Sequence, residues 1–215
     1  MTTYINDTFT GTNGAAWSGT YWTSAMATAG STATIQSNKG RLNTGTLTNW
    51  AGQEGMRYSG STTVANTEFV GTFTFPNSAE VYFYVEVRSG STFDGGNCYS
   101  VYFDGTTCTF DKAVAYVGTN FSSKAFAPGV GVAFGVRLRA VGTTIQYRAW
   151  TGTEPGTWDT TVTDSSVANG SVGVIALGGA AAGAIVDVDD VLVTDGAAAA
   201  TAYPFGTTTP TPRYK

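Results

Sequence analysis

Two alternating runs on either side of a short break make Val136–Trp150 the most constraining stretch of this sequence. If Val141-Gly142 is a two-residue loop, Leu138 lies opposite Ile145, and every facing pair is apolar with apolar or polar with polar. A slip of one residue would move each apolar set to the other face. The stretch therefore predicts a hairpin in a sheet with one buried and one solvated face, closed by a type II turn with Gly142 at positive φ or by a longer loop.

The same alternation recurs along the chain and predicts an all-β protein of roughly eleven to thirteen strands. In Glu80–Arg88 the apolar positions should be core, and the alternate positions, Glu86 and Arg88 included, should face solvent. Residues 4–10 should form a strand. The other expected elements are a hairpin over Ile35–Leu47, a hairpin of Tyr99–Phe103 with Thr107–Val117, a loop over Phe121–Gly131, a strand near Thr160–Thr163, and a closing pair of Ser171–Leu177 with Ile185–Val193.

Composition limits the classes of protein that this chain can belong to. One domain of 215 residues suits an all-β sandwich, and the 12% of charged residues and 28 glycines favour strands and turns over helices. A net charge of −4 without a basic stripe argues against nucleic-acid binding. No apolar run approaches the length of a membrane span, so we expect no membrane association.

The start of the chain and the cysteines indicate where the protein is assembled. The first residues contain neither a basic start nor an apolar core, so they do not resemble a signal peptide. Either such a segment was removed, or the protein acts or is assembled in the cytosol. The hairpin between Cys98 and Cys108 places Cys98 opposite Asp111, or opposite Ala113 with a four-residue loop, and in neither case opposite the other thiol. Free thiols are typical of proteins that assemble in the cytosol.

A family resemblance rests on several segments in a fixed order. The strand that ends in Ala149-Trp150 is followed by Glu154-Pro155 and then Trp158. The remaining segments are Asp7–Gly11 with Trp17 and Trp22, Gly170–Val174, and Val188–Val193. Together they resemble the concanavalin A-like, laminin-G-like jelly roll over roughly residues 4–195, a fold whose two antiparallel sheets bring both chain ends together. By this resemblance the domain covers residues 1–196, and it is of the kind found in tailed-phage virion proteins.

The last residues, 197–215, differ in character from the rest. They are rich in Ala, Thr and Pro, and Pro210 and Pro212 favour an extended conformation over regular pairing. A disordered end is one interpretation. We prefer docking on a neighbouring subunit, because a solvating tail does not need Tyr203, Phe205 and Tyr214.

The chain offers few groups for catalysis or metal binding. It contains no His, which removes Ser-His triads and most zinc sites. Asp187 and Asp189 share a strand face, but the next position on that face is Val191, so the row of acids found in related glycosidases is incomplete. The doubled acid Asp189-Asp190 instead suggests a bulge or a capped strand end. Calcium would have to use Asp187, Asp189, Asp190 and Asp195, and no loop has a dense Asp/Asn array, so we expect no metal and no cofactor.

Sugar binding requires aromatic faces beside polar donors. The residues that alternation could bring to one sheet face for this purpose are Tyr82, Tyr84, Tyr102, Arg148 and Trp150. The alternative is that these are ordinary half-buried residues of a sheet.

Three functional classes follow from these observations. The first is a non-enzymatic surface protein of a tailed-bacteriophage virion, either a head decoration or a minor tail protein, assembled in the host cytoplasm. Its expected partners are other virion proteins, further copies of itself as a homo-oligomer, and host glycans. The second is a carbohydrate-binding module of a secreted or cell-surface bacterial protein. The third is a glycoside hydrolase, which the incomplete row of acids disfavours.

Overall fold

The computed structural model describes residues 1–46, 51–60, 63–77, 81–90, 96–178 and 183–197, and these form fifteen β-strands and no helix. None of these residues therefore belongs to a helix that could cross a membrane. The strands are β1 (Thr3–Asp7), β2 (Trp22–Ala27), β3 (Thr32–Ile35), β4 (Gly40–Asn43), β5 (Gln53–Tyr58), β6 (Thr67–Thr74), β7 (Val81–Ser89), β8 (Asn97–Phe103), β9 (Thr107–Val114), β10 (Val117–Ala125), β11 (Phe134–Val141), β12 (Thr144–Thr151), β13 (Thr160–Thr163), β14 (Ser171–Gly178) and β15 (Ile185–Thr194).

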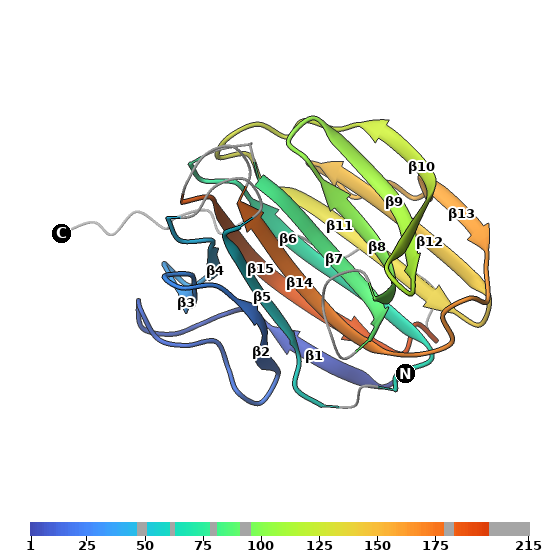
Figure 1. The fold of residues 1–215 in the computed structure, drawn as a ribbon, viewed down its shortest axis with the longest axis horizontal. Coiled ribbons are helices and arrows are strands. Elements are labelled where there is room, and N and C mark those ends of the chain that lie inside the picture. The colour runs from blue at the N-terminus through green and yellow to red at the C-terminus, as the bar shows by residue number, and fades with distance from the viewer. Residues whose placement is uncertain (47–50, 61–62, 78–80, 91–95, 179–182, 198–215) are drawn as a thin grey trace, which may run out of the picture.

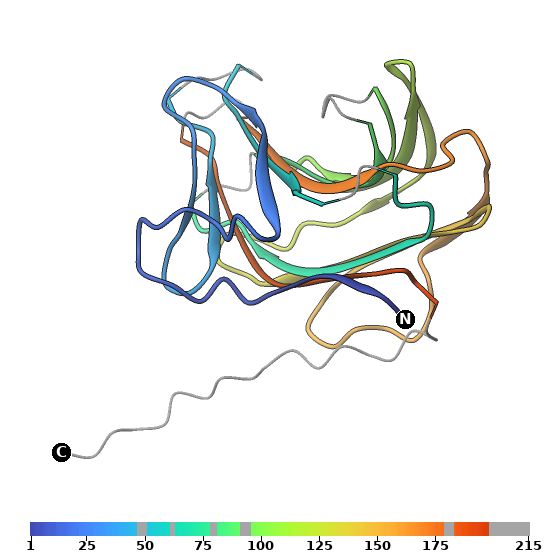
Figure 2. The same cartoon turned by 90° about the horizontal axis from the view of Figure 1, so that it is seen from below.

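The strands are arranged in two antiparallel sheets that face each other (Figures 1 and 2). The front sheet has the order β10-β9-β8-β7-β14-β5-β2. The back sheet has the order β13-β12-β11-β6-β15-β4-β3, and β1 also pairs with β15. The expected two-sheet jelly-roll sandwich is therefore confirmed. Tyr203, Phe205 and Tyr214, the expected docking groups, lie outside the described residues.

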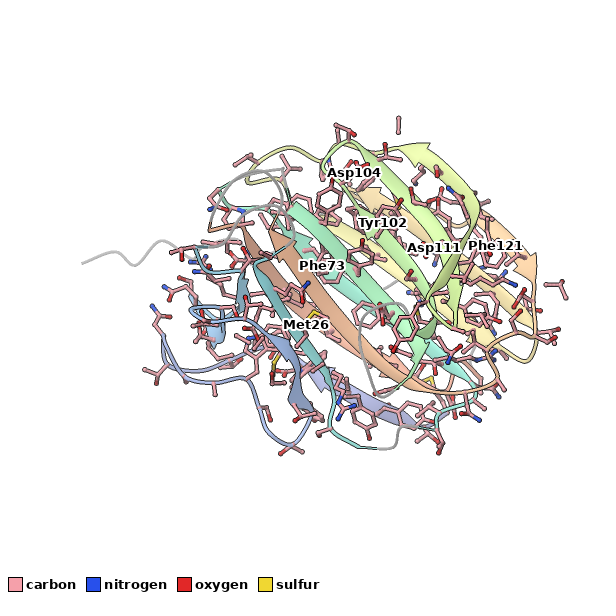
Figure 3. The ribbon with its side chains drawn as sticks, in the orientation of Figure 1. Met26, Phe73, Tyr102, Asp104, Asp111 and Phe121 are labelled. Atoms are coloured by element: carbon pink, nitrogen blue, oxygen red, sulfur yellow. The ribbon has the colours of Figure 1, made fainter. Side chains whose placement is uncertain are left out.

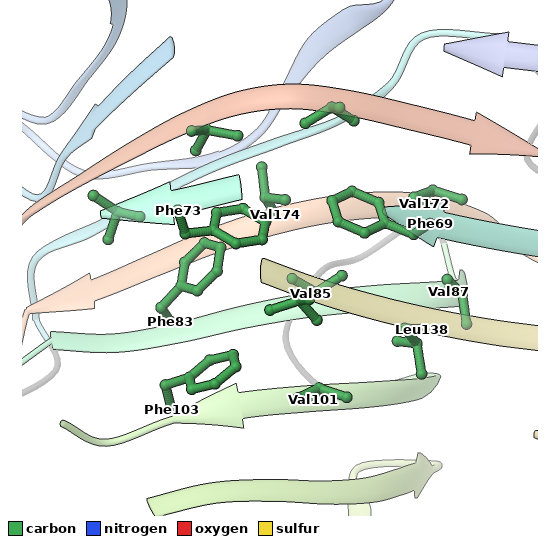
Figure 4. Close-up of a cluster of buried hydrophobic side chains, with 14 of the residues drawn as sticks. Phe69, Phe73, Phe83, Val85, Val87, Val101, Phe103, Leu138, Val172 and Val174 are labelled. Carbon is green, nitrogen blue, oxygen red and sulfur yellow. The ribbon is translucent and has the colours of Figure 1, made fainter. Parts of the chain in front are cut away.

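The core lies between the two sheets and is built from the inward set of each alternating strand (Figure 4). Phe73 of the back sheet contacts Phe83 of the front sheet, with ring centroids 4.6 Å apart. Leu138, Ile145 and the four apolar residues of β7 have no exposed surface, as the alternation predicts. Burial of apolar surface on both inner faces is the main stabilising term of such a sandwich.

The hairpin of β11 and β12 forms, but its register differs from the expected one by two residues. Leu138 lies opposite Tyr147, and Ala140 opposite Ile145. The loop is Gly142-Thr143, and Gly142 has φ 57° at the first loop position rather than the second. A shift of two residues keeps every side chain on its expected face, so the alternation alone did not discriminate between the two registers.

The chain ends meet as expected, but the expected closing pair does not form. β1 pairs with β15, which confirms the junction of the first and last strands. β14 does not pair with β15: it lies between β7 and β5 in the front sheet, whereas β15 lies in the back sheet. The two strands are consecutive in the sequence and belong to opposite layers, a relation that a pattern of alternation does not encode.

The strand count was underestimated because polar strands lack the apolar signal. Residues 121–125, expected in a loop, belong to β10, which is the outer strand of the front sheet and is largely exposed. An edge strand needs few buried side chains, so its sequence resembles that of a loop. β2 and β5 are further additions.

The early aromatic residues pack at one end of the sandwich. Trp17 and Trp22 are both buried, and each contacts the ring of Phe9. The Trp22 indole donates to Asp7 Oδ2 at 2.8 Å, and the Trp17 indole donates to the carbonyl oxygen of Thr34 at 3.0 Å. Both residues are therefore structural, and Trp22 begins β2.

The cysteines are free, as the hairpin register predicts. Cys98 lies opposite Ala113, and Phe103 lies opposite Cys108, which corresponds to the four-residue loop. Both thiols are buried. Burial raises the pKa of Cys108 to about 12, so this thiol is protonated at neutral pH.

Glu86 and Arg88 are buried rather than solvated, which corrects the expectation for this strand. Arg88 has φ 50° at a point where the pairing of β7 with β14 shifts register, so a bulge redirects its side chain. Its guanidinium donates to the carbonyl oxygens of Ala65, Val167 and Gly142 at 2.7, 2.9 and 2.7 Å. These acceptors belong to three separate loops, so Arg88 joins the loops at one end of the sandwich.

We predict that Arg88→Lys lowers the free energy of unfolding by about 2 kcal/mol, because a single ammonium cannot reach three carbonyls in three directions. Denaturant unfolding measures the change. Arg41→Lys is the matched control: its partner is Asp187 in a partly exposed ion pair, so the loss should stay below about 1 kcal/mol. Equal losses in the two variants would contradict the role given to Arg88.

Candidate functional site

The front sheet is curved, and its outer side is the concave one (Figure 2). Strand register arranges the outward side chains of this face in rows that run across the strands. One row contains Tyr84, Tyr102, Thr109 and Ser123, and the next contains Arg57, Gly173, Glu86, Ser100, Asp111 and Asn120. The face therefore carries aromatic and polar groups side by side on four adjacent strands, β7 to β10.

A tyrosine pair is the main apolar feature of this face. Tyr84 and Tyr102 lie directly opposite each other on β7 and β8, and their rings stack at 5.2 Å with an interplanar angle of 26°. Both are half-buried. Because the rings face each other across neighbouring strands, the second face of Tyr102 is directed toward β9, where its partner is the small Thr109 (Figure 3). Burial is the first cause that raises the pKa of Tyr84, so its hydroxyl remains protonated.

Hydroxyl and amide groups lie beside the tyrosine pair. The hydroxyls of Thr109 and Ser123 are 3.2 Å apart, and the Asn120 amide donates to Ser123 Oγ at 2.9 Å. Ser123 and Asn120 are exposed. This arrangement presents donors and acceptors beside the aromatic rings, as a ligand rich in hydroxyls requires.

A carboxylate completes the polar part of the face. The Ser100 hydroxyl donates to Asp111 Oδ1 across β8 and β9. Burial raises the pKa of Asp111 to about 6, and this hydrogen bond opposes the shift. Glu86, on the other side of Ser100, is 3% exposed, and its Oε2 accepts a hydrogen bond from the Ser89 hydroxyl at 2.6 Å.

The structure brings together only part of the set expected for sugar binding. Tyr82, Tyr84 and Tyr102 share the concave face of the front sheet. Arg148 and Trp150 belong to β12 of the back sheet, and both are buried, so the expectation that all of them share one sheet face is wrong. Alternation separates the inner from the outer side of a strand but does not say to which sheet the strand belongs.

Arg148 instead takes part in a buried charged network on the outer side of the back sheet. Glu154 accepts hydrogen bonds from Arg137 Nε at 2.6 Å and from Arg148 Nε at 2.8 Å. The ring of Trp158 lies 4.7 Å from the guanidinium of Arg148, and Glu68 pairs with Arg137. These contacts hold residues 152–158 over the back sheet, so this group is structural.

The acidic residues near the end of the chain have separate structural partners. Asp187 forms a two-point ion pair with Arg41, and Asp195 accepts from the backbone N–H of Thr2 at 2.7 Å. Asp190 has φ 49°, and the pairing of β15 with β6 shifts register between Asp189 and Leu192, so the expected bulge is confirmed. Within the described parts of the chain, no group of three or more His, Cys, Asp or Glu residues is placed to hold a metal ion.

Sequence reasoning did not single out Ser100, Thr109, Asp111, Asn120 and Ser123. A usable signal was present, because the four-residue loop that places Cys98 opposite Ala113 also places Ser100 opposite Asp111 and Tyr102 opposite Thr109. Asn120 and Ser123 lie on β10, a strand that was interpreted as a loop and carried no such signal.

No family model and no curated protein matches this sequence. Solved structures do resemble it. The carbohydrate-binding module CBM66 from Bacillus subtilis superposes with a TM-score of 0.57 at 15% identity, over 80% of this chain and 94% of that one. The exoplasmic/lumenal domain of VIP36, in a form bound to Ca²⁺ and Man3GlcNAc, gives 0.58 at 9% identity, over 84% and 85%.

A third similar structure, the GH43B protein of a Bacteroides ovatus xyloglucan locus, gives a TM-score of 0.60 at 16% identity, over 89% of this chain and 39% of that one. At such identities these likenesses establish the fold. The chain has the concanavalin A-like jelly-roll sandwich that carbohydrate-binding domains also adopt.

The raised pKa of Asp111 predicts a dependence of stability on pH. Its pKa is about 6 in the folded protein against about 3.9 when unfolded, so its stabilising contribution is complete below about pH 4 and is lost as the pH rises through 6. We predict that Asp111→Asn removes up to about 3 kcal/mol of the decline in unfolding free energy between pH 4 and pH 7.

Denaturant unfolding at a series of pH values measures this difference. Asp189→Asn is a matched control on the other sheet, because the pKa of Asp189 is also raised to about 6, by burial first and then by Asp190. It should remove a separate share of the decline, and the two effects should add. An Asp111→Asn profile that parallels the wild-type profile would contradict the assignment.

Proposed function

We propose that this protein is a non-catalytic glycan-binding module whose ligand lies on the concave face of the front sheet. The observation that carries the proposal is the stacked pair Tyr84–Tyr102 beside the hydroxyl and amide groups of Thr109, Ser123 and Asn120. Sugars have one side rich in C–H groups and a rim of hydroxyls, and this face offers a matching surface for each.

The position of the site within the fold supports the proposal. The backbone of β7 to β10 holds the aromatic and polar groups in fixed register, so the site is preformed rather than assembled by loops. The similar structures include a carbohydrate-binding module and a domain in complex with Man3GlcNAc. At their identities they support the proposal only through the shared fold.

Binding is favoured over hydrolysis by the state of the two acids on this face. Glu86 and Asp111 are two strand spacings apart, roughly 10 Å, with Ser100 between them. Glu86 is buried and already accepts from the Ser89 hydroxyl, so it is poorly placed to exchange a proton with a ligand. A pair of accessible acids on either side of a sugar bond is what glycosidases require.

The setting in which the module acts is a second proposal: the surface of a tailed-phage virion, assembled in the host cytoplasm, where glycan binding would serve adhesion to the host. The two unpaired, buried thiols support an origin in a reducing compartment. A carbohydrate-binding module of a secreted or cell-surface bacterial protein is the alternative, and it uses the same face.

We predict that Tyr102→Ala weakens binding to any glycan that a printed array identifies by about tenfold, because a stacking contact contributes about 0.5–1.5 kcal/mol beyond the area that it buries. Tyr84→Ala should give a smaller loss, since Tyr84 supports the ring of Tyr102. Titration calorimetry with the identified glycan measures both changes.

Tyr116→Ala is the matched control, because Tyr116 is 64% exposed at the turn between β9 and β10, away from the tyrosine pair. Its affinity should equal that of the wild type. An array without any bound glycan, or a Tyr102→Ala variant that binds normally, would overturn the proposed site.

Mass spectrometry of purified particles tests the virion setting. We expect this chain in particles in copy numbers close to those of the capsid subunit if it decorates the head, and in a few copies if it belongs to the tail. Its absence from particles, or a longer secreted form of the chain, would favour the alternative setting.

A further inference from the structure

The half of the concave face formed by β7 to β10 carries acidic side chains. Its outward charged side chains among the described residues are Glu86 and Asp111. The two lysines of these strands lie on the opposite side of the front sheet. Lys112 Nζ contacts Ser166 Oγ at 2.8 Å and pairs with Asp164. Lys124 Nζ donates to the carbonyl oxygen of Ala149 at 2.7 Å and pairs with Asp159. Neither lysine neutralises Asp111.

Asp111 is the accessible carboxylate of this pair. It is partly exposed, and within the described chain its carboxylate accepts from Ser100 and forms no ion pair. With a pKa of about 6, it is ionised at pH 7 although burial disfavours the charge. An asparagine could accept the same hydrogen bond without the cost of burying a charge. Stability therefore does not explain why this position carries a carboxylate.

Asp111 also lies within reach of a sugar stacked on Tyr102. Thr109 is the strand partner of Tyr102, and Asp111 is two residues further along β9 on the same face, roughly 7 Å away by strand rise. A pyranose ring over Thr109 therefore directs a ring substituent toward Asp111. A positive substituent would form a charge-assisted hydrogen bond there, and a negative one would be repelled.

We propose that Asp111 makes this site select glycans by charge, so that it binds sugars with a free amino group in preference to neutral sugars and rejects acidic sugars. This inference rests on the proposed function, since it assigns a ligand class to the same face. The ammonium of a hexosamine is the expected partner of Asp111, while Tyr102 and the hydroxyls of Thr109 and Ser123 hold the ring.

Two matched probe series test the inference. Serum albumin conjugates carry glucose, glucosamine, N-acetylglucosamine or glucuronic acid, and a second set carries the corresponding galactose sugars. Binding to the immobilised full chain is measured by interferometry at pH 7.0. In at least one series, we expect the amine conjugate to bind about tenfold more tightly than the neutral one, the acetylated conjugate to match the neutral one, and the acidic conjugate to bind weakest.

The variants separate the roles of charge and stacking. Asp111→Asn should abolish the preference for the amine, so that the amine, neutral and acidic conjugates of a series bind with similar affinity. Asp190→Asn, an equal change of charge on the back sheet, should behave as the wild type. Tyr102→Ala should weaken all members of the series together.

The outcomes distinguish the two proposals. Binding of neutral and amine conjugates with equal affinity, or a preference that survives in Asp111→Asn, would overturn the inference and leave the glycan-binding function in place. If the wild type binds no conjugate of either series and no glycan on the array, the proposed function falls and the inference falls with it.

Discussion

The contact between the two inner faces of the sandwich is the constraint on which everything else depends. Phe73 of the back sheet touches Phe83 and Phe134, and Phe103 of the front sheet touches Phe134. These rings set the separation of the layers and fix which side of each strand is inward. The outward rows of the front sheet follow directly, because a strand whose inner set is buried cannot shift by one residue without exposing it.

The two outer faces then serve different purposes. On the back sheet, residues 152–158 cover Arg148, and Glu154 satisfies Arg137 and Arg148 together. On the front sheet, the concave outer face carries the rings of Tyr84 and Tyr102 and the hydroxyls of Thr109 and Ser123. The charged groups of the covered face pair with one another, whereas Asp111 on the concave face forms no ion pair within the described chain.

Most of the strands, and the tyrosines of the candidate site, could be predicted from local sequence. Alternation predicted that the apolar residues of Val81–Val87 and Leu138 belong to the core, and it placed Tyr84 and Tyr102 on an outer face. Arg148 and Trp150 met the same local criterion and yet lie on the other sheet under a loop. The criterion reports a side of a strand, so it is blind to the assignment of strands to layers and to loops that cover a face.

The sequence by itself determined that this chain forms layers of alternating strands and that Cys98 and Cys108 do not face each other. These properties depend on periodicity and on local register, which neighbouring residues encode. The tertiary structure alone decided that β14 and β15 belong to opposite sheets, that Arg88 turns inward to join three loops, and that Asp111 lies beside Tyr102. Those outcomes require the simultaneous packing of segments far apart in the chain, because each relieves a burial or hydrogen-bonding demand that exists only once the layers have met.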